Sequence, residues 1–90
     1  MGTLANPSRT ACFSIHAEAE PSVMPRVLDQ FAKRGLVPDQ WHSSCTEGCG
    51  SELVIDIQIS ALDPALVRAI AEALRRIVHV GQVLTAEKSP

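Results

Sequence analysis

The sequence predicts one small α+β domain, in which two helices cover one face of a four-stranded antiparallel sheet. Three observations predict this fold. Four segments alternate apolar and polar residues, and two others repeat apolar residues at helical spacing. These segments follow one another as strand, helix, strand, strand, helix, strand. Because the chain has only 90 residues, all six segments must share a single core.

The first strand is expected at residues 10–18, after a short polar stretch. Residues 1–9 are small and polar, which predicts a flexible N-terminal tail before one domain at residues 10–88. In the strand, Phe13 and Ile15 share one face with Ala17, as the period of two requires.

The first helix is expected to follow this strand and to end at a glycine. Ser22 can accept a backbone N–H bond at the helix start, and Pro25 falls in the first turn. Gly35 supplies the left-handed position that closes the helix. The expected buried stripe contains Val23, Val27, Leu28, Phe31 and Ala32, with Met24 at its edge.

The middle of the chain predicts a hairpin of unequal strands. Residues 36–44 form the weaker strand, and Pro38 confines it to the edge of the sheet. Residues 45–51 hold two glycines and are expected to form the loop. Residues 52–60 form the clearest strand, with four large apolar residues on one face: Leu53, Ile55, Ile57 and Ile59.

The last third predicts a second helix and a final short strand. Asp63 and Pro64 are a strong helix start, since aspartate caps the helix and proline suits its first position. This helix is expected to end near His79, before a strand at 82–87. Its expected buried stripe contains Leu66, Val67, Ile70, Ala73, Leu74, Ile77 and Val78.

This βαββαβ order predicts a ferredoxin-like fold with the strands arranged 4-1-3-2. Right-handed crossovers place both helices on one face of the sheet. The other face is mixed in polarity, and two interpretations remain open: a solvated face, or a face partly covered by a partner chain. The edge strand at 36–44 can also pair with a second copy.

Composition and charge exclude several classes of function. The net charge is −2 and the basic residues are spread along the chain, so neither nucleic acid nor a membrane is an expected partner. No apolar run approaches the roughly 20 residues of a membrane span. An odd number of cysteines and no signal peptide predict a cytoplasmic protein with reduced thiols.

Two clusters carry potential chemistry. His42, Cys45 and Cys49 have a spacing that zinc can use, but plain loop cysteines or a small disulfide fit it as well, and a fourth ligand is not evident. His16 and Asp56 are expected to meet across neighbouring strands, with Ser14 or Ser60 beside them. An open sheet face excludes no water, so we expect no catalytic residue there. Because a fourth ligand is missing, we also expect no metal at the His42 cluster. His79 is expected to contact the negative end of the second helix dipole.

Residues 10–87 resemble an ACT domain, the amino-acid-sensing module of metabolic enzymes. The resemblance rests on Pro21 to Leu28, on the helix end from Phe31 to Leu36, and on Leu74 to Val80 before the last strand. The chain is most similar to the small regulatory subunits of acetolactate (acetohydroxyacid) synthase, which act in branched-chain amino-acid biosynthesis.

This resemblance implies a non-catalytic homodimer that carries no cofactor of its own. It implies that the chain activates the thiamine-diphosphate-dependent catalytic large subunit of acetolactate synthase. It also implies a small amino-acid ligand at the turn between the first strand and the first helix, which contains Glu18, Ala19, Glu20, Pro21, Ser22 and Val23. Two alternatives remain open: a stand-alone amino-acid-binding ACT protein with another partner, and a metal or thiol protein using His42, Cys45 and Cys49.

Overall fold

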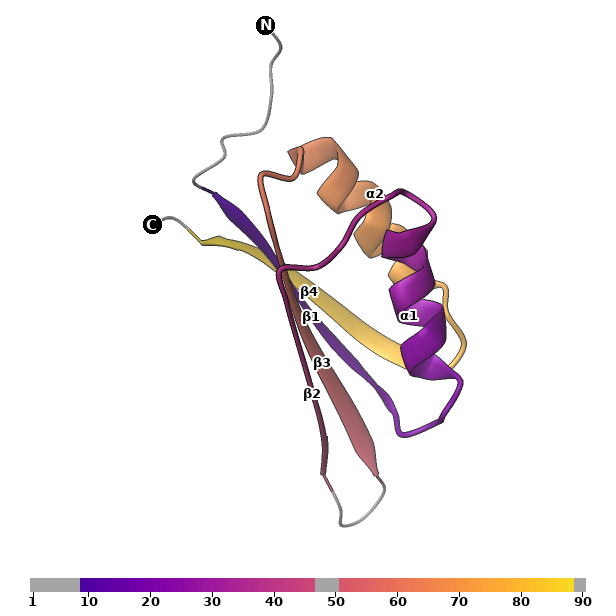
Figure 1. Ribbon diagram of the computed structural model, residues 1–90. Helices are drawn as coiled ribbons and strands as arrows, with labels where there is room; N and C mark the ends of the chain where they lie inside the picture. Colours follow the sequence, from indigo (N-terminus) through magenta and orange to yellow (C-terminus); the bar gives the residue numbers. More distant parts are fainter. Residues whose placement is uncertain (1–8, 47–50, 89–90) are drawn as a thin grey trace, which may run out of the picture.

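The computed structural model describes residues 9–46 and 51–88 and confirms the predicted fold. Both helices lie on the same face of one four-stranded sheet (Figure 1). The strand order is β2-β3-β1-β4, with all neighbours antiparallel, as the crossover rule predicts. In chain order the elements are β1 (Thr10–Glu18), α1 (Val23–Ala32), β2 (Gln40–Thr46), β3 (Glu52–Ser60), α2 (Pro64–Arg75) and β4 (Val80–Lys88).

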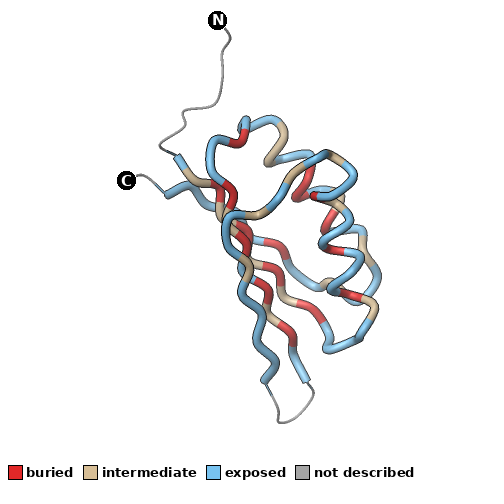
Figure 2. Tube along the Cα trace, in the orientation of Figure 1, coloured by how far each residue is buried: buried red, intermediate tan, exposed pale blue. Residues whose placement is uncertain are grey.

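The core lies between the helices and the inner face of β1 and β3. In the β1–β3 register Phe13 lies opposite Ile57, and Ile15 lies opposite Ile55, so the inward residues of the two strands meet in pairs. Buried and partly exposed positions alternate along both strands (Figure 2). Phe31 of α1 packs edge-on against the Phe13 ring, with the two centroids 5.4 Å apart. The inward faces predicted for β1 and β3 are therefore confirmed.

The helix ends differ in how well the sequence predicted them. Asp63 caps α2 by accepting a hydrogen bond from the Ala65 N–H at 2.8 Å, as expected. Gly35 has the expected positive φ of 72°. The N–H groups of Gly35 and Leu36 donate hydrogen bonds to backbone carbonyls in the last turn of α1. The cap predicted at Ser22 is wrong, because Ser22 already has helical backbone angles and its side chain makes no capping bond.

The boundaries of β2 differ from the prediction. The strand begins at Gln40 rather than at residue 36 and continues through Thr46. The start is fixed by Asp39, whose carboxylate accepts hydrogen bonds from the N–H and the hydroxyl of Ser60, both at 2.6 Å. Cys45 therefore lies in the strand and not in the predicted loop, most of which, residues 47–50, lies outside the described residues.

The second helix ends earlier than predicted, and the last strand is longer. Helix α2 stops at Arg75, and the chain then turns through His79, which has a positive φ of 78°. Strand β4 then begins at Val80 and runs through Lys88. None of the described helices has the length and apolar character of a membrane span.

The predicted apolar stripes were too wide. Leu28 is 45% exposed and Val78 is 60% exposed, and Ala32 is also exposed. One layer of helices contacts the sheet with a narrow stripe, which on α1 contains Val23, Val27 and Phe31. Of the predicted tail, residues 1–8 lie outside the described residues, whereas Arg9 forms an ion pair with Glu87.

Candidate functional site

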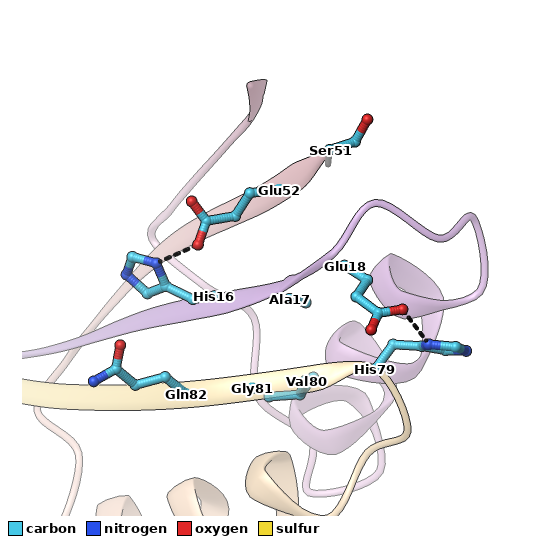
Figure 3. A pocket seen from close by; sticks show the side chains of 9 residues that line it. All are labelled: His16, Ala17, Glu18, Ser51, Glu52, His79, Val80, Gly81 and Gln82. Atoms are coloured by element: carbon cyan, nitrogen blue, oxygen red, sulfur yellow. Dashed lines mark hydrogen bonds and ion pairs between the residues drawn. The ribbon is translucent and has the colours of Figure 1, made fainter. Parts of the chain in front are cut away.

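A hollow of about 680 Å³ lies at the end of the sheet where β1 leads toward α1. Strands β1, β3 and β4 all contribute to it, together with the turn before β4 (Figure 3). Its charged and titratable lining consists of two glutamates and two histidines. The complete lining is His16, Ala17, Glu18, Ser51, Glu52, His79, Val80, Gly81 and Gln82.

The two carboxylates of the hollow lie on neighbouring strands. Glu18 is the direct cross-strand partner of Glu52 in the β1–β3 register. Like charges in such a position repel, because their Cβ atoms are about 5 Å apart. Each carboxylate is turned toward a different imidazole (Figure 3): Glu18 Oε1 lies 2.9 Å from His79 Nδ1, and Glu52 Oε2 lies 3.3 Å from His16 Nδ1. Each histidine thus partners one member of a repelling pair.

His79 is fixed to β1 by its backbone as well as by its ring. The Glu18 N–H donates to the His79 carbonyl at 2.9 Å, so Glu18 contacts both the backbone and the imidazole ring of His79. These contacts maintain a left-handed backbone that is uncommon outside glycine. The predicted role of His79 as a contact to the helix dipole is wrong, because α2 ends four residues earlier and the ring pairs with Glu18.

The six residues predicted for the ligand turn do not converge on this hollow. Glu18 lines it, and Ser22 lines a separate groove between α1 and the turn after α2. Val23 is fully buried in the core. Ala19, Glu20 and Pro21 are exposed between these positions. Sequence analysis missed Glu52 and His16 as neighbours of Glu18, because only the strand register brings them together.

The expected contact between His16 and Asp56 does not form. The register places Asp56 opposite Ser14, and His16 pairs with Glu52 instead. Ser14 Oγ lies 3.4 Å from His16 Nε2, and Ser60 is held by Asp39. The Asp56 carboxylate therefore does not orient the His16 ring.

The spacing of His42, Cys45 and Cys49 does not assemble a metal site within the described residues. His42 lies opposite Asp56 on the outer face of the sheet, whereas Cys45 lies opposite Leu53 on the inner face. Side chains on opposite faces of one strand cannot ligate the same ion. Cys49 lies outside the described residues. Among residues 9–46 and 51–88, no three or more His, Cys, Asp or Glu side chains are grouped to hold a metal.

Comparison with solved structures shows the same fold in several proteins. An uncharacterized protein from Thermotoga maritima has a TM-score of 0.69 at 15% identity, covering 88% of this chain and 95% of that one. The ACT domain from GTP pyrophosphokinase of Chlorobium tepidum gives 0.64 at 14% identity, covering 93% and 100%. The GlnK–ATP complex of B. subtilis gives 0.62 at 18% identity, covering 91% and 85%. At these identities the likeness concerns the fold alone.

Comparison by sequence gives the family. No curated protein matches the chain significantly. The sequence profile of the family described as ACT-like domain, ACT_12, matches residues 5–89, which include all the strands and helices that the structure describes. The chain therefore belongs to the ACT-like domain family.

Proposed function

We propose that this chain is a non-catalytic regulatory module that binds a small amino acid in the hollow beside Glu18 and Glu52. Family membership supports a regulatory role, since the resemblance found in the sequence is to amino-acid-sensing modules. In this proposal the chain works as a homodimer, carries no cofactor and transmits ligand binding to a catalytic partner.

The observation that carries the proposal is the Glu18–Glu52 pair. Two carboxylates at directly opposed positions of neighbouring strands repel each other, and a cation placed between them relieves that repulsion. The ammonium group of an amino acid has the charge and the three donors that such a pair requires. Because both carboxylates are largely exposed, a ligand can replace their histidine contacts without breaking the core.

The histidines suit the other end of the same ligand. His16 and His79 use Nδ1 for the carboxylates, so the Nε2 atom of His79 is not engaged by a described residue. A protonated imidazole donates from both nitrogens and can bind the carboxylate of the amino acid. Of the six residues in the predicted ligand turn, Glu18 is the one proposed to contact the ligand directly. The Glu20 N–H donates to the Glu18 carbonyl at 2.8 Å and so helps to hold Glu18 in place.

The resemblance found in the sequence suggests the catalytic subunit of acetolactate synthase as the partner, with thiamine diphosphate and the chemistry on that subunit. The alternative is a stand-alone amino-acid-binding protein that regulates another enzyme. A pull-down with the tagged full chain from native lysate separates these possibilities. Recovery of a thiamine-dependent synthase in near-equal amount supports the first, and its absence contradicts it.

Thermal unfolding with each of the twenty amino acids tests the ligand proposal. An amino acid present at about 100 times its dissociation constant adds about 2.7 kcal/mol to the free energy of unfolding. Glu52→Gln removes one charge of the repelling pair, so we expect the free protein to become more stable while the response to the ligand is lost. This opposition of signs distinguishes a binding residue from a merely structural one.

Glu72→Gln is the matched control, because Glu72 is an exposed glutamate on α2 whose one ion-pair partner among the described residues is Arg75. It should leave the response to the ligand unchanged. If no amino acid raises the melting temperature, or if Glu52→Gln responds as the wild type does, the proposed ligand site is wrong.

A further inference from the structure

The fold separates the two signs of charge. Six of the eight Lys and Arg residues lie in segments 22–35 and 64–78, which form the helices and the turns that close them, whereas eight of the ten Asp and Glu residues lie elsewhere. The two helices lie on the same face of the sheet (Figure 1), so these six basic residues belong to one layer of the fold although they are spread along the sequence. The net charge of the chain is small, but the helical layer is basic and the rest of the chain is acidic.

A groove of about 610 Å³ crosses this face between α1 and the turn after α2. Arg26 projects from α1 and Arg76 follows the end of α2, so one guanidinium stands on each side. Neither guanidinium makes an ion pair or hydrogen bond with another described residue, in contrast to Arg34 and Arg75. Two cations that form no ion pair within the described chain outnumber the single carboxylate of the groove, so the net field there attracts carboxylates.

The rest of the groove adds an apolar and a polar component. Ile77 and Val78 provide its apolar part, and Val78 is 60% exposed although it is a large aliphatic residue. The Ser22 hydroxyl makes no capping bond and can donate to an acceptor in the groove. Asp29 is the one carboxylate in the lining, so an occupant must leave that position free of negative charge.

We propose that this groove binds an acidic, partly apolar segment of a partner protein. Charge complementarity supports that occupant, since carboxylates on the segment meet Arg26 and Arg76 while an aliphatic side chain covers Val78. A nucleic acid fits less well, because none of the three aromatic residues of the chain lines the groove to stack a base. The partner proposed above would dock here, but the inference does not depend on its identity or on an amino-acid ligand.

The test uses a synthetic amphipathic peptide of Glu, Leu and Ala, about 15 residues long, and the full chain labelled for two-dimensional NMR. We expect shift changes at Ser22 to Gln30 and at Arg76 to Val78. Raising the salt concentration from about 50 to about 300 mM should weaken binding at least about tenfold. Arg26→Glu/Arg76→Glu should weaken binding by at least about tenfold at low salt.

Lys33→Glu/Arg68→Glu is the matched control, because it makes the same change of charge on the same helical layer but outside the groove. It should weaken binding by no more than about threefold. Equal losses in the two variants would mean that general attraction and not the groove binds the peptide. Shift changes confined to other surfaces, or an oligonucleotide that binds as tightly as the peptide, would also overturn the proposal.

A second copy of the chain is the remaining occupant, because its acidic residues could enter the groove. In that case Arg26→Glu/Arg76→Glu would change the sedimentation coefficient of the protein in the absence of peptide. Such a change would contradict the proposal that the groove binds a different protein. The ligand proposal is tested by amino-acid binding at Glu52, so either proposal can fail while the other stands.

Discussion

At the scale of single residues, the two described glycines differ in what their lack of a side chain provides. Gly35 has a positive φ of 72°, and a Cβ atom added there would meet nothing within 4 Å. Glycine is therefore needed at position 35 for its backbone conformation and not to avoid a steric clash. Gly81 has no positive φ, and an added Cβ would lie 3.7 Å from the His16 carbonyl oxygen, which is an ordinary contact.

We therefore expect Gly35→Ala to lower the free energy of unfolding by about 1 to 2 kcal/mol, the cost of a left-handed backbone with a Cβ atom. Gly81→Ala is the control and should change it much less. Urea denaturation followed by circular dichroism measures both values. Equal effects of the two substitutions would show that the end of α1 does not depend on this conformation.

The sequence predicted which way residues face better than it predicted which residues touch. The period of two in β1 and β3 oriented Phe13 and Ile55 correctly, because alternation is a local property of a strand. The Glu18–His79 contact joins residues 61 positions apart, and no local pattern marks it. The candidate site depends on such contacts, and only one of its four charged or titratable residues, Glu18, belongs to the predicted ligand turn.

At the scale of elements, boundaries were set by contacts with distant residues. Strand β2 starts where Asp39 binds Ser60 of β3, and α2 ends before a turn that Glu18 of β1 holds. The two well-predicted strands, β1 and β3, have strong alternation and neighbours on both sides. Propensity was therefore sufficient at the centre of the sheet and insufficient at its edge, where one tertiary contact decides the boundary.

Asp39 also makes the attachment of β2 dependent on pH. The hydrogen bonds from the Ser60 hydroxyl and then from the Ser60 N–H lower the pKa of Asp39 below its ordinary value of 3.8. A carboxyl group with a lowered pKa in the folded state stabilises the protein above its unfolded pKa, and this contribution is lost as the pH falls through the folded pKa. The stabilisation is thus complete above about pH 5 and disappears in stronger acid.

Asp39→Asn should accordingly reduce the free energy of unfolding at pH 7, and the difference from the wild type should shrink as the pH falls from about 5 to about 2.5. Urea denaturation at each pH measures that difference. Asp56→Asn, on the exposed face of β3, is the control for removing a sheet carboxylate that does not bind Ser60. A difference that stays constant with pH would mean that the Asp39 carboxylate is not what fastens β2.

At the scale of the whole molecule, the sheet has two unlike edges. On β4, the Arg75 guanidinium occupies the Val83 carbonyl at 2.9 Å, and a register shift interrupts the strand beside Ala17. Both features oppose pairing with another strand. Strand β2 has an uninterrupted register with β3 and contains neither lysine nor proline. The β2 edge is therefore the one that can pair with another strand.

The exposed apolar residues of α1 lie on the side of the helix that faces away from its groove. They are Met24 and Leu28. We propose that a second copy covers this β2 side.

Leu28→Lys should therefore weaken a homodimer at least about tenfold, since it places a charge in the covered surface. Leu84→Lys is the matched control, because Leu84 is 50% exposed on the opposite face of the sheet and Leu28 is 45% exposed. Sedimentation velocity over a range of protein concentrations measures both. A monomeric wild type, or a greater loss with Leu84→Lys, would contradict dimerisation through β2.

The position of Trp41 on β2 has a practical consequence for all of these experiments. It is the single tryptophan of a chain that has no tyrosine, and it is half-buried against the core opposite Ile57. The intrinsic fluorescence of the protein therefore arises at one edge strand. When water is removed from that edge, the emission of Trp41 shifts to shorter wavelengths, whereas unfolding shifts this emission to longer wavelengths. The chain carries its own optical reporter of association, which requires no label.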